Sequence, residues 1–171
     1  MKKRKMQENT IILTNKQIGH KIKRMAFQVY ETNVKETEVI IAGIKENGFQ
    51  LAKKLKTEVE KISPLKVTLC EVYIDKKKPT SRVETSISLS ELRNKSLLLV
   101  DDVLSTGTTL IYGVKHFLEI PLKQFKTAVL VDRNHKNYPV KADFKGISLS
   151  TSLNENVAVV FDKNNCRAIL E

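Results

Sequence analysis

The stretch LLLVDDVLSTGTT, residues 97–109, joins an apolar run to two adjacent acids and a turn rich in hydroxyl groups. The run Leu97–Val100 predicts a buried strand of a parallel sheet, because strands covered on both faces are apolar throughout. Apolar residues at helical spacing follow the turn, from Leu110 to Leu118, and Pro121 ends the helix that they predict. A buried strand that leads through a tight turn into a helix is typical of α/β proteins.

The same alternation extends to both sides of this stretch. We predict helices from Thr14 or Asn15 to Tyr30 and from Gly48 to the residues before Pro64, and strands at Val39–Ala42, Leu65–Ile74, Ala128–Val131, Asp143–Leu149, Val157–Phe161 and Ala168–Leu170. The polar segment Asp75–Glu91 is expected to be a loop with a short strand near Ile87. The pattern predicts an α/β protein with a Rossmann-like parallel sheet and helices on both of its faces.

Composition narrows the class of protein. The chain has 171 residues and a net charge of +11, which is compatible with a nucleic acid or a small anionic substrate as partner. Its two cysteines, Cys70 and Cys166, are far apart in the sequence, so we expect neither a disulfide framework nor a zinc knuckle. We expect a reducing, cytoplasmic location. No apolar run approaches the 18 residues or so that a membrane span needs. The basic start Met1–Met6 is followed by polar residues, so we expect no export signal.

The turn after Asp101 and Asp102 has the chemistry of an anion site. Free N–H groups at the start of a helix, a glycine that permits close approach and flanking hydroxyl groups suit a phosphate monoester. The turn has neither the lysine of a Walker loop nor the GxGxxG of a dinucleotide site. The two acids fit a ligand with hydroxyl groups beside its phosphate, because carboxylates accept hydrogen bonds strongly. A ribose 5-phosphate unit has this form. The plainer alternative is that the acids only end the strand and Thr106 caps the helix.

With these residues in view, LLLVDDVLSTGTT resembles the phosphoribosyl-diphosphate signature of type I phosphoribosyltransferases. The stretch AVLVDRNHKNYPVKADFKG, residues 128–146, resembles the pyrimidine-attenuation regulators of the PyrR type, which also act as uracil phosphoribosyltransferases. Gly43–Gly48 resembles their diphosphate loop. The resemblance implies one phosphoribosyltransferase-like domain over residues 1–171. A small hood is expected from about residues 1–20 and 138–171.

The resemblance also assigns roles to residues. Asp101 and Asp102 would hold the ribose hydroxyls as the catalytic pair. The 5-phosphate would lie on Ser105, Thr106, Gly107, Thr108 and Thr109. The diphosphate would lie near Lys45, Glu46 and Asn47, with Lys76, Lys77, Lys78 and Arg82 as a mobile basic loop. The base would meet Arg133, Phe144 and Lys145. Magnesium would arrive with phosphoribosyl diphosphate, and no metal is expected to be held by the protein alone.

Some positions depart from the family pattern. Ser105 stands where the regulators usually carry an aromatic residue and where purine enzymes usually carry an aspartate. Asn47 and Thr108 stand where the regulators usually carry arginine. Since a serine hydroxyl without an activating partner is a poor base at neutral pH, Ser105 disfavours hypoxanthine and guanine as substrates. Lys76–Lys78 and Arg82 could replace the missing arginines, or could be a solvated run.

Two functions of different class remain open from the sequence. The first is a magnesium-dependent phosphoribosyltransferase that joins a base, uracil for preference, to phosphoribosyl diphosphate and releases diphosphate. The second is a PyrR-like regulator of pyrimidine genes that binds RNA and has weak or no catalysis. Basic residues of the first two helices would form its RNA surface: Lys16, Lys21, Lys23, Arg24, Lys53, Lys54 and Lys56. A purine salvage enzyme is a third, disfavoured alternative, and a homo-oligomer, either a dimer or a tetramer, is expected.

Overall fold

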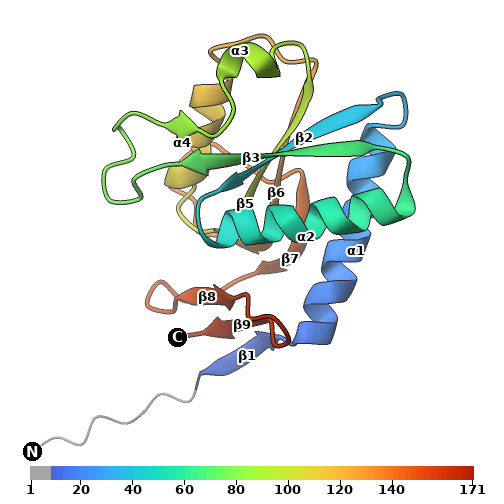
Figure 1. Cartoon of the computed structure of the whole chain (residues 1–171). Coiled ribbons are helices and arrows are strands. Elements are labelled where there is room, and N and C mark those ends of the chain that lie inside the picture. Colours follow the sequence, from blue (N-terminus) through green and yellow to red (C-terminus); the bar gives the residue numbers. More distant parts are fainter. Residues whose placement is uncertain (1–8) are drawn as a thin grey trace, which may run out of the picture.

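A mostly parallel sheet of six strands forms the centre of the computed structural model, which describes residues 9–171 (Figure 1). Its strand order is β4-β3-β2-β5-β6-β7. The strands β2 (Glu38–Ile44), β3 (Lys66–Tyr73), β5 (Ser96–Leu104), β6 (Gln124–Arg133) and β7 (Phe144–Leu149) are parallel, and β4 (Glu84–Thr85) is antiparallel at the edge. The predicted α/β fold is therefore confirmed.

Helices cover both faces of this sheet, as the sequence predicts. On one face α1 (Asn15–Thr32) and α2 (Asn47–Ile62) bury their apolar sides in one core. On the other face α3 (Leu89–Leu92) and α4 (Thr108–Phe117) enclose a second core. The start of α1 is fixed by a capping box, in which Thr14 Oγ1 accepts from Gln17 N at 3.3 Å and Gln17 Oε1 accepts from Thr14 N at 2.9 Å.

A small antiparallel sheet stands below the main sheet in Figure 1. It consists of β1 (Thr10–Leu13), β9 (Arg167–Leu170) and β8 (Val157–Val160), in that order. These strands come from the two ends of the chain, where the hood is expected. Residues 1–8 of the expected hood lie outside the described residues.

Strand β7 differs from the expectation. It falls inside the stretch 138–171 expected for the hood, yet it pairs parallel to β6 and extends the main sheet. Arg24 of α1 donates to the carbonyl oxygens of Lys145 at 2.9 Å and of Gly146 at 2.7 Å. These bonds attach α1 to the edge strand β7 and satisfy two of its backbone acceptors.

Other boundaries also shift. The segment predicted as a loop with a short strand near Ile87 has that strand, β4, at Glu84–Thr85. It also holds α3, which was not predicted, and Ser88 forms a capping box with Glu91 at the start of this helix. Strand β5 is longer than the predicted Leu97–Val100 and includes both Asp101 and Asp102. Within residues 9–171, no helix has the length and apolarity that crossing a membrane would require.

Candidate functional site

The neighbouring strands β2 and β5 are parallel, but the order in which the chain adds strands to the sheet reverses between them. From β2 the chain continues outward to β3, and from β5 it continues the other way to β6. The loops that leave β2 and β5 therefore diverge and open a crevice at the carboxyl ends of the strands, the place where open parallel sheets bind ligands. The two loops are Lys45–Glu46, directly before Asn47 at the start of α2, and Ser105–Gly107, and both fall within stretches predicted to bind the ligand.

The predicted phosphate residues do come together. Ser105, Thr106, Gly107, Thr108 and Thr109 line a hollow of about 60 Å³ together with Asp101 and neighbouring residues. Since α4 begins at Thr108, the hollow lies at the N-terminus of a helix, where free N–H groups and the helix dipole favour an anion.

The turn of this hollow depends on Gly107. Its φ of 86° lies in the left-handed region, and a Cβ at this position would come within 2.6 Å of Val140 Cγ1. The preceding carbonyl oxygen, of Thr106, accepts from Asn137 N at 2.8 Å and from Tyr138 N at 3.3 Å. The turn is thus held from outside by the segment that leads into β7.

The two acids lie at the end of β5 and are almost fully buried, with 4% of Asp101 and 9% of Asp102 exposed. The backbone N–H of Asp102 donates to Asp101 Oδ1 at 2.9 Å. Burial raises the pKa of the Asp101 carboxyl well above its ordinary value, and the nearby charge of Asp102 raises it further. A buried acid with such a raised pKa in a crevice is typical of a functional site.

The loop after β2 is held against these acids. Asn47 Nδ2 donates to Asp102 Oδ2 at 3.0 Å and to the carbonyl oxygen of Val159 in β8 at 2.8 Å. Gly48 permits this approach, because a Cβ there would lie 2.9 Å from the carbonyl oxygen of Val100. Glu46 has a φ of 72°, a conformation that costs energy for a residue with a side chain and that often marks ligand loops. Lys45 places its Nζ 5.7 Å from the centre of the Tyr73 ring.

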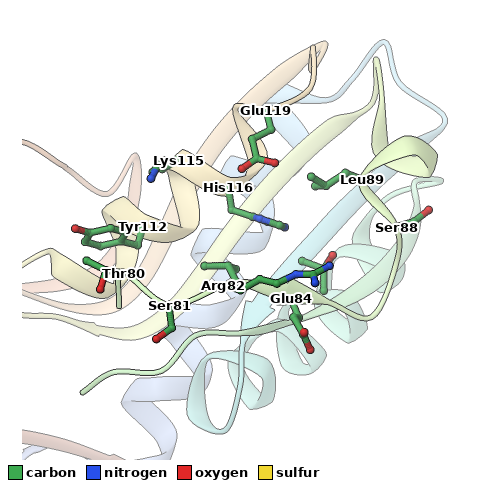
Figure 2. A pocket seen from close by; sticks show the side chains of 12 residues that line it. Thr80, Ser81, Arg82, Glu84, Ser88, Leu89, Tyr112, Lys115, His116 and Glu119 are labelled. Atoms are coloured by element: carbon green, nitrogen blue, oxygen red, sulfur yellow. The ribbon is translucent and has the colours of Figure 1, made fainter. Parts of the chain in front are cut away.

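The basic segment after β3 divides into two parts. Lys76, Lys77 and Lys78 are exposed on a turn in which Asp75 Oδ1 accepts from the N–H groups of Lys77 and Lys78 at 2.9 and 3.2 Å. Burial and the charge of Asp102 raise the pKa of Asp101, and the positive charge of Lys76 acts in the opposite direction and lowers it. Arg82, in contrast, lines a separate cavity against α4 (Figure 2).

Arg133 lies beside the phosphate turn. Its side chain is buried, and Nη1 donates to Ser105 Oγ at 3.3 Å while Nε donates to Thr151 Oγ1 at 3.0 Å. Nη2 donates to the carbonyl oxygens of Ser152 at 3.4 Å and Glu155 at 2.5 Å. Arg133 thereby joins the phosphate turn to the segment that leads into β8.

Comparison with known proteins fits this geometry. The family described as "Phosphoribosyl transferase domain" matches residues 8–164. The chain belongs to the phosphoribosyltransferase family.

Relatives support the finer resemblance as well. The "Bifunctional protein PyrR" of Bacillus subtilis is 33% identical over 179 aligned positions, which cover 97% of this chain and 99% of that protein. The protein of the same name from Geobacter sulfurreducens is 32% identical, covering 94% of this chain and 95% of that protein. The resemblance to PyrR proteins predicted from the sequence is confirmed.

Solved structures show the same fold. The hypoxanthine phosphoribosyltransferase of Trypanosoma cruzi has a TM-score of 0.76 at 17% identity, covering 94% of this chain and 95% of that one. A hypoxanthine-guanine phosphoribosyltransferase of Bacillus anthracis has a TM-score of 0.72 at 18% identity, covering 90% and 88%. These likenesses establish the type I phosphoribosyltransferase fold.

The two β7 residues predicted to meet the base, Phe144 and Lys145, have different surroundings in this phosphoribosyltransferase. Phe144 is buried in the core shared with α1 and α2, opposite Ala128 in the middle of β6, so its ring packs in the core and not at the crevice. Lys145 forms an ion pair with Asp132, with Nζ 3.1 Å from Oδ2. Both positions follow from the pairing of β7 with β6. Lys145 lies opposite Val129, which also pairs with Asp101, so the backbone of Lys145 is level with this acid.

The sequence analysis missed the parts of the site that come from the hood side. The carbonyl oxygens of Val159 and Glu155 and the hydroxyl of Thr151 bind Asn47 or Arg133. Any residue type supplies a backbone carbonyl, so these positions carry no signal in the sequence. Only the resemblance of the whole chain to a family with a hood could have pointed to them.

Proposed function

We propose that this phosphoribosyltransferase joins uracil to phosphoribosyl diphosphate, releasing diphosphate and UMP. The observation that carries the proposal is the phosphate hollow at the start of α4, directly beside two buried carboxylates at the end of β5. This pairing of an anion hollow with hydrogen-bond acceptors matches a ribose that bears a 5-phosphate.

The reaction needs positioning and charge more than a nucleophilic side chain. The bond from the anomeric carbon to diphosphate breaks with its electron pair on the leaving oxygen. The N1 nitrogen of uracil forms the new bond to this carbon, and its proton passes to solvent. Asp101 and Asp102 orient the ribose and favour the positive charge that develops on it. Backbone groups of Lys45–Asn47 border the diphosphate, and the lysines Lys76–Lys78 neutralise it as it leaves.

Magnesium fits the oxygen atoms at this edge. Among residues 9–171 no three His, Cys, Asp or Glu side chains are grouped to hold a metal ion. Asp101 and Asp102 are nevertheless the kind of ligands that a magnesium ion takes alongside substrate oxygens. Such an ion would supply positive charge to the diphosphate. It would also favour the charged form of Asp101, against the burial that raises the pKa of this acid.

Uracil is preferred to a purine because of Ser105. Arg133 Nη1 donates to Ser105 Oγ, so the serine oxygen already accepts a hydrogen bond from a cation and is a still weaker base. We therefore expect the protein to select its base by how well the base binds and not by a basic side chain at residue 105. Arg133, next to the phosphate turn, is the residue expected to contact the base.

A base screen tests this function. Purified protein with phosphoribosyl diphosphate and magnesium is offered uracil, cytosine, hypoxanthine, guanine or orotate, and diphosphate release is measured. Release with uracil, lost in the variant with Asp101→Asn and Asp102→Asn, supports the proposal. Release only with a purine, or equal release by the double variant, overturns it.

A PyrR-like RNA-binding regulator is the second candidate. Lys16, Lys23 and Lys53 are exposed on the layer of α1 and α2 and have no hydrogen bond or ion pair within residues 9–171. Arg24 and Lys56 of the same expected surface instead donate to backbone carbonyl oxygens of β7 and β3.

A cytoplasmic location and a homo-oligomer, either a dimer or a tetramer, stay predictions. Analytical ultracentrifugation measures the oligomeric state.

A further inference from the structure

A second cavity, of about 690 Å³, lies between the segment Thr80–Leu89 and the outer part of α4 (Figure 2). None of its lining residues lines the phosphate hollow, so the two are separate. Its volume falls in the range of sites that bind small molecules. The function proposed above makes no use of it.

One wall of this cavity carries an unsatisfied buried atom. His116 Nε2 is buried and has no hydrogen-bond partner within the described residues. Burial lowers the pKa of His116, so the ring is neutral near pH 7 and one of its nitrogens carries a proton. A buried polar atom without a hydrogen-bond partner destabilises the protein, so an external partner at this place is favourable. In Figure 2, His116 and Arg82 come from facing walls, and both side chains extend into the space between these walls.

Charged side chains line the same cavity without pairing among themselves. Arg82 and Lys115 are the cations, and Glu84 and Glu119 are the acids. Within residues 9–171 none of these side chains takes part in a salt bridge. Lys115 Nζ lies 5.9 Å from the centre of the Tyr112 ring. The cavity thus offers cations for an anion, acids for hydroxyl groups and an aromatic ring.

We propose that this cavity binds a phosphate monoester that also carries hydroxyl groups, such as a sugar phosphate or a nucleoside monophosphate. The phosphate lies between Arg82 and His116, where a guanidinium and a ring N–H donate to it. The hydroxyl groups lie toward Glu84 and Glu119, because a bare anion would be repelled by these acids. The site does not depend on whether the crevice between β2 and β5 is catalytic.

Calorimetric titration of the full chain with ribose 5-phosphate, UMP and inorganic phosphate tests the proposal. The variant Thr108→Asp places a carboxylate in the phosphate hollow, at a helix start where an acid is well tolerated. We expect this variant to retain one binding event for ribose 5-phosphate or UMP, with inorganic phosphate at least 10-fold weaker. Loss of all binding in Thr108→Asp overturns the proposal, and equally tight inorganic phosphate overturns the role of the hydroxyl groups.

Further substitutions, made together with Thr108→Asp, test whether the remaining binding takes place in this cavity. His116→Phe keeps a ring of similar size but removes both ring nitrogens, and we expect affinity to fall at least 10-fold. Since His116 packs against Phe117, Lys115→Glu serves as a second variant on an exposed position, with an expected loss of about 3–10-fold. Lys141→Glu, the same charge change at another exposed lysine, is the control and leaves affinity unchanged. Unchanged binding in both His116→Phe and Lys115→Glu overturns the assignment, whatever the base screen gives.

Discussion

Asn47 donates a hydrogen bond of 3.0 Å to the Asp102 carboxylate, across 55 positions of sequence. The same amide donates to the carbonyl oxygen of Val159 at 2.8 Å. One side chain therefore joins the loop after β2, the acid at the end of β5 and the hood strand β8. The position of the hood relative to the crevice depends on this amide.

We expect Asn47→Ala to loosen the hood and weaken ribose 5-phosphate binding. A hydrogen bond to a charged group contributes about 1.5–3 kcal/mol, so the free energy of unfolding should fall by about that amount. Hydrogen exchange at the β8 amides should rise first, measured by NMR or mass spectrometry. Asn154→Ala, an exposed asparagine in the segment before β8, is the control. Equal exchange at β8 in both variants would contradict this role of Asn47.

Asp101→Asn should stabilise the fold while it removes turnover. The folded protein raises the pKa of Asp101 well above its ordinary value, so the charge of this acid destabilises the fold as pH rises above the unfolded pKa. An amide keeps the acceptor for Asp102 N but carries no charge. Each kcal/mol gained raises Tm by about 2–4 °C in a chain of this size. We expect at least that gain at pH 7 and none near pH 3, measured by calorimetry. A lower Tm at pH 7 would show that the charged form is stabilised.

The fold could be predicted because its signals are local. Apolar runs, helical spacing and the Gly107 turn each lie within a short stretch, and the structure places them as one parallel sheet with its loops at one edge. Contacts between distant residues could not be predicted. The bonds of Asn47 to β8 and of Arg133 to Ser105 depend on how the hood returns over the sheet.

Phe144 and Arg82 illustrate the same limit for the site. An aromatic residue beside an exposed lysine is compatible with a base site or with a core strand, and only the pairing of β7 with β6 decides that Phe144 packs inside. Arg82 follows the lysines in sequence, but β4 turns the chain back along β3 and carries it toward α4. Proximity in the sequence therefore does not place Arg82 at the diphosphate.

Gly107→Val should abolish ribose 5-phosphate binding in the hollow. A β-branched residue is strained at a φ of 86°, and its Cβ would meet Val140 Cγ1 at 2.6 Å. We expect a loss of at least 10-fold in affinity and a lower Tm. Gly19→Ala is the matched control, since a Cβ at residue 19 would have no atom within 4 Å and alanine favours a helix by about 0.5–1 kcal/mol. Normal binding by folded Gly107→Val would place the phosphate elsewhere.

Arg133→Met should release the segment that leads into β8. Methionine keeps the apolar part of the buried side chain but loses the donors to Ser105, Thr151 and the two carbonyl oxygens. We expect faster proteolysis within residues 150–156 and a larger fall in kcat/KM for uracil than in ribose 5-phosphate affinity. Arg93→Met, at an exposed arginine without a side-chain hydrogen bond within residues 9–171, is the control. Equal proteolysis of both variants would contradict the joining role of Arg133.

Changing Lys76, Lys77 and Lys78 to Ala together separates the enzyme from the RNA regulator. As the anomeric bond breaks, the diphosphate gains negative charge, and cations present at that moment lower the barrier. Because β3 runs parallel to β2 and β5, the segment that follows it starts at the same edge of the sheet as the acids. Removing a preorganised donor costs about 10²–10³ in rate, and exposed lysines on a turn should cost less, about 10-fold.

The enzyme therefore requires a slower single-turnover rate of the triple variant with every base that reacts. The RNA regulator requires the opposite result: an unchanged rate, weaker RNA binding and a salt dependence flatter by up to about three contacts. Lys16→Ala with Lys23→Ala and Lys53→Ala is the matched control, because these exposed lysines lie on the α1 and α2 layer, away from the segment after β3. If the triple variant at Lys76–Lys78 changes neither rate nor RNA affinity, the run is a solvated surface. The diphosphate must then be neutralised by the loop Lys45–Asn47 and by the magnesium that arrives with it.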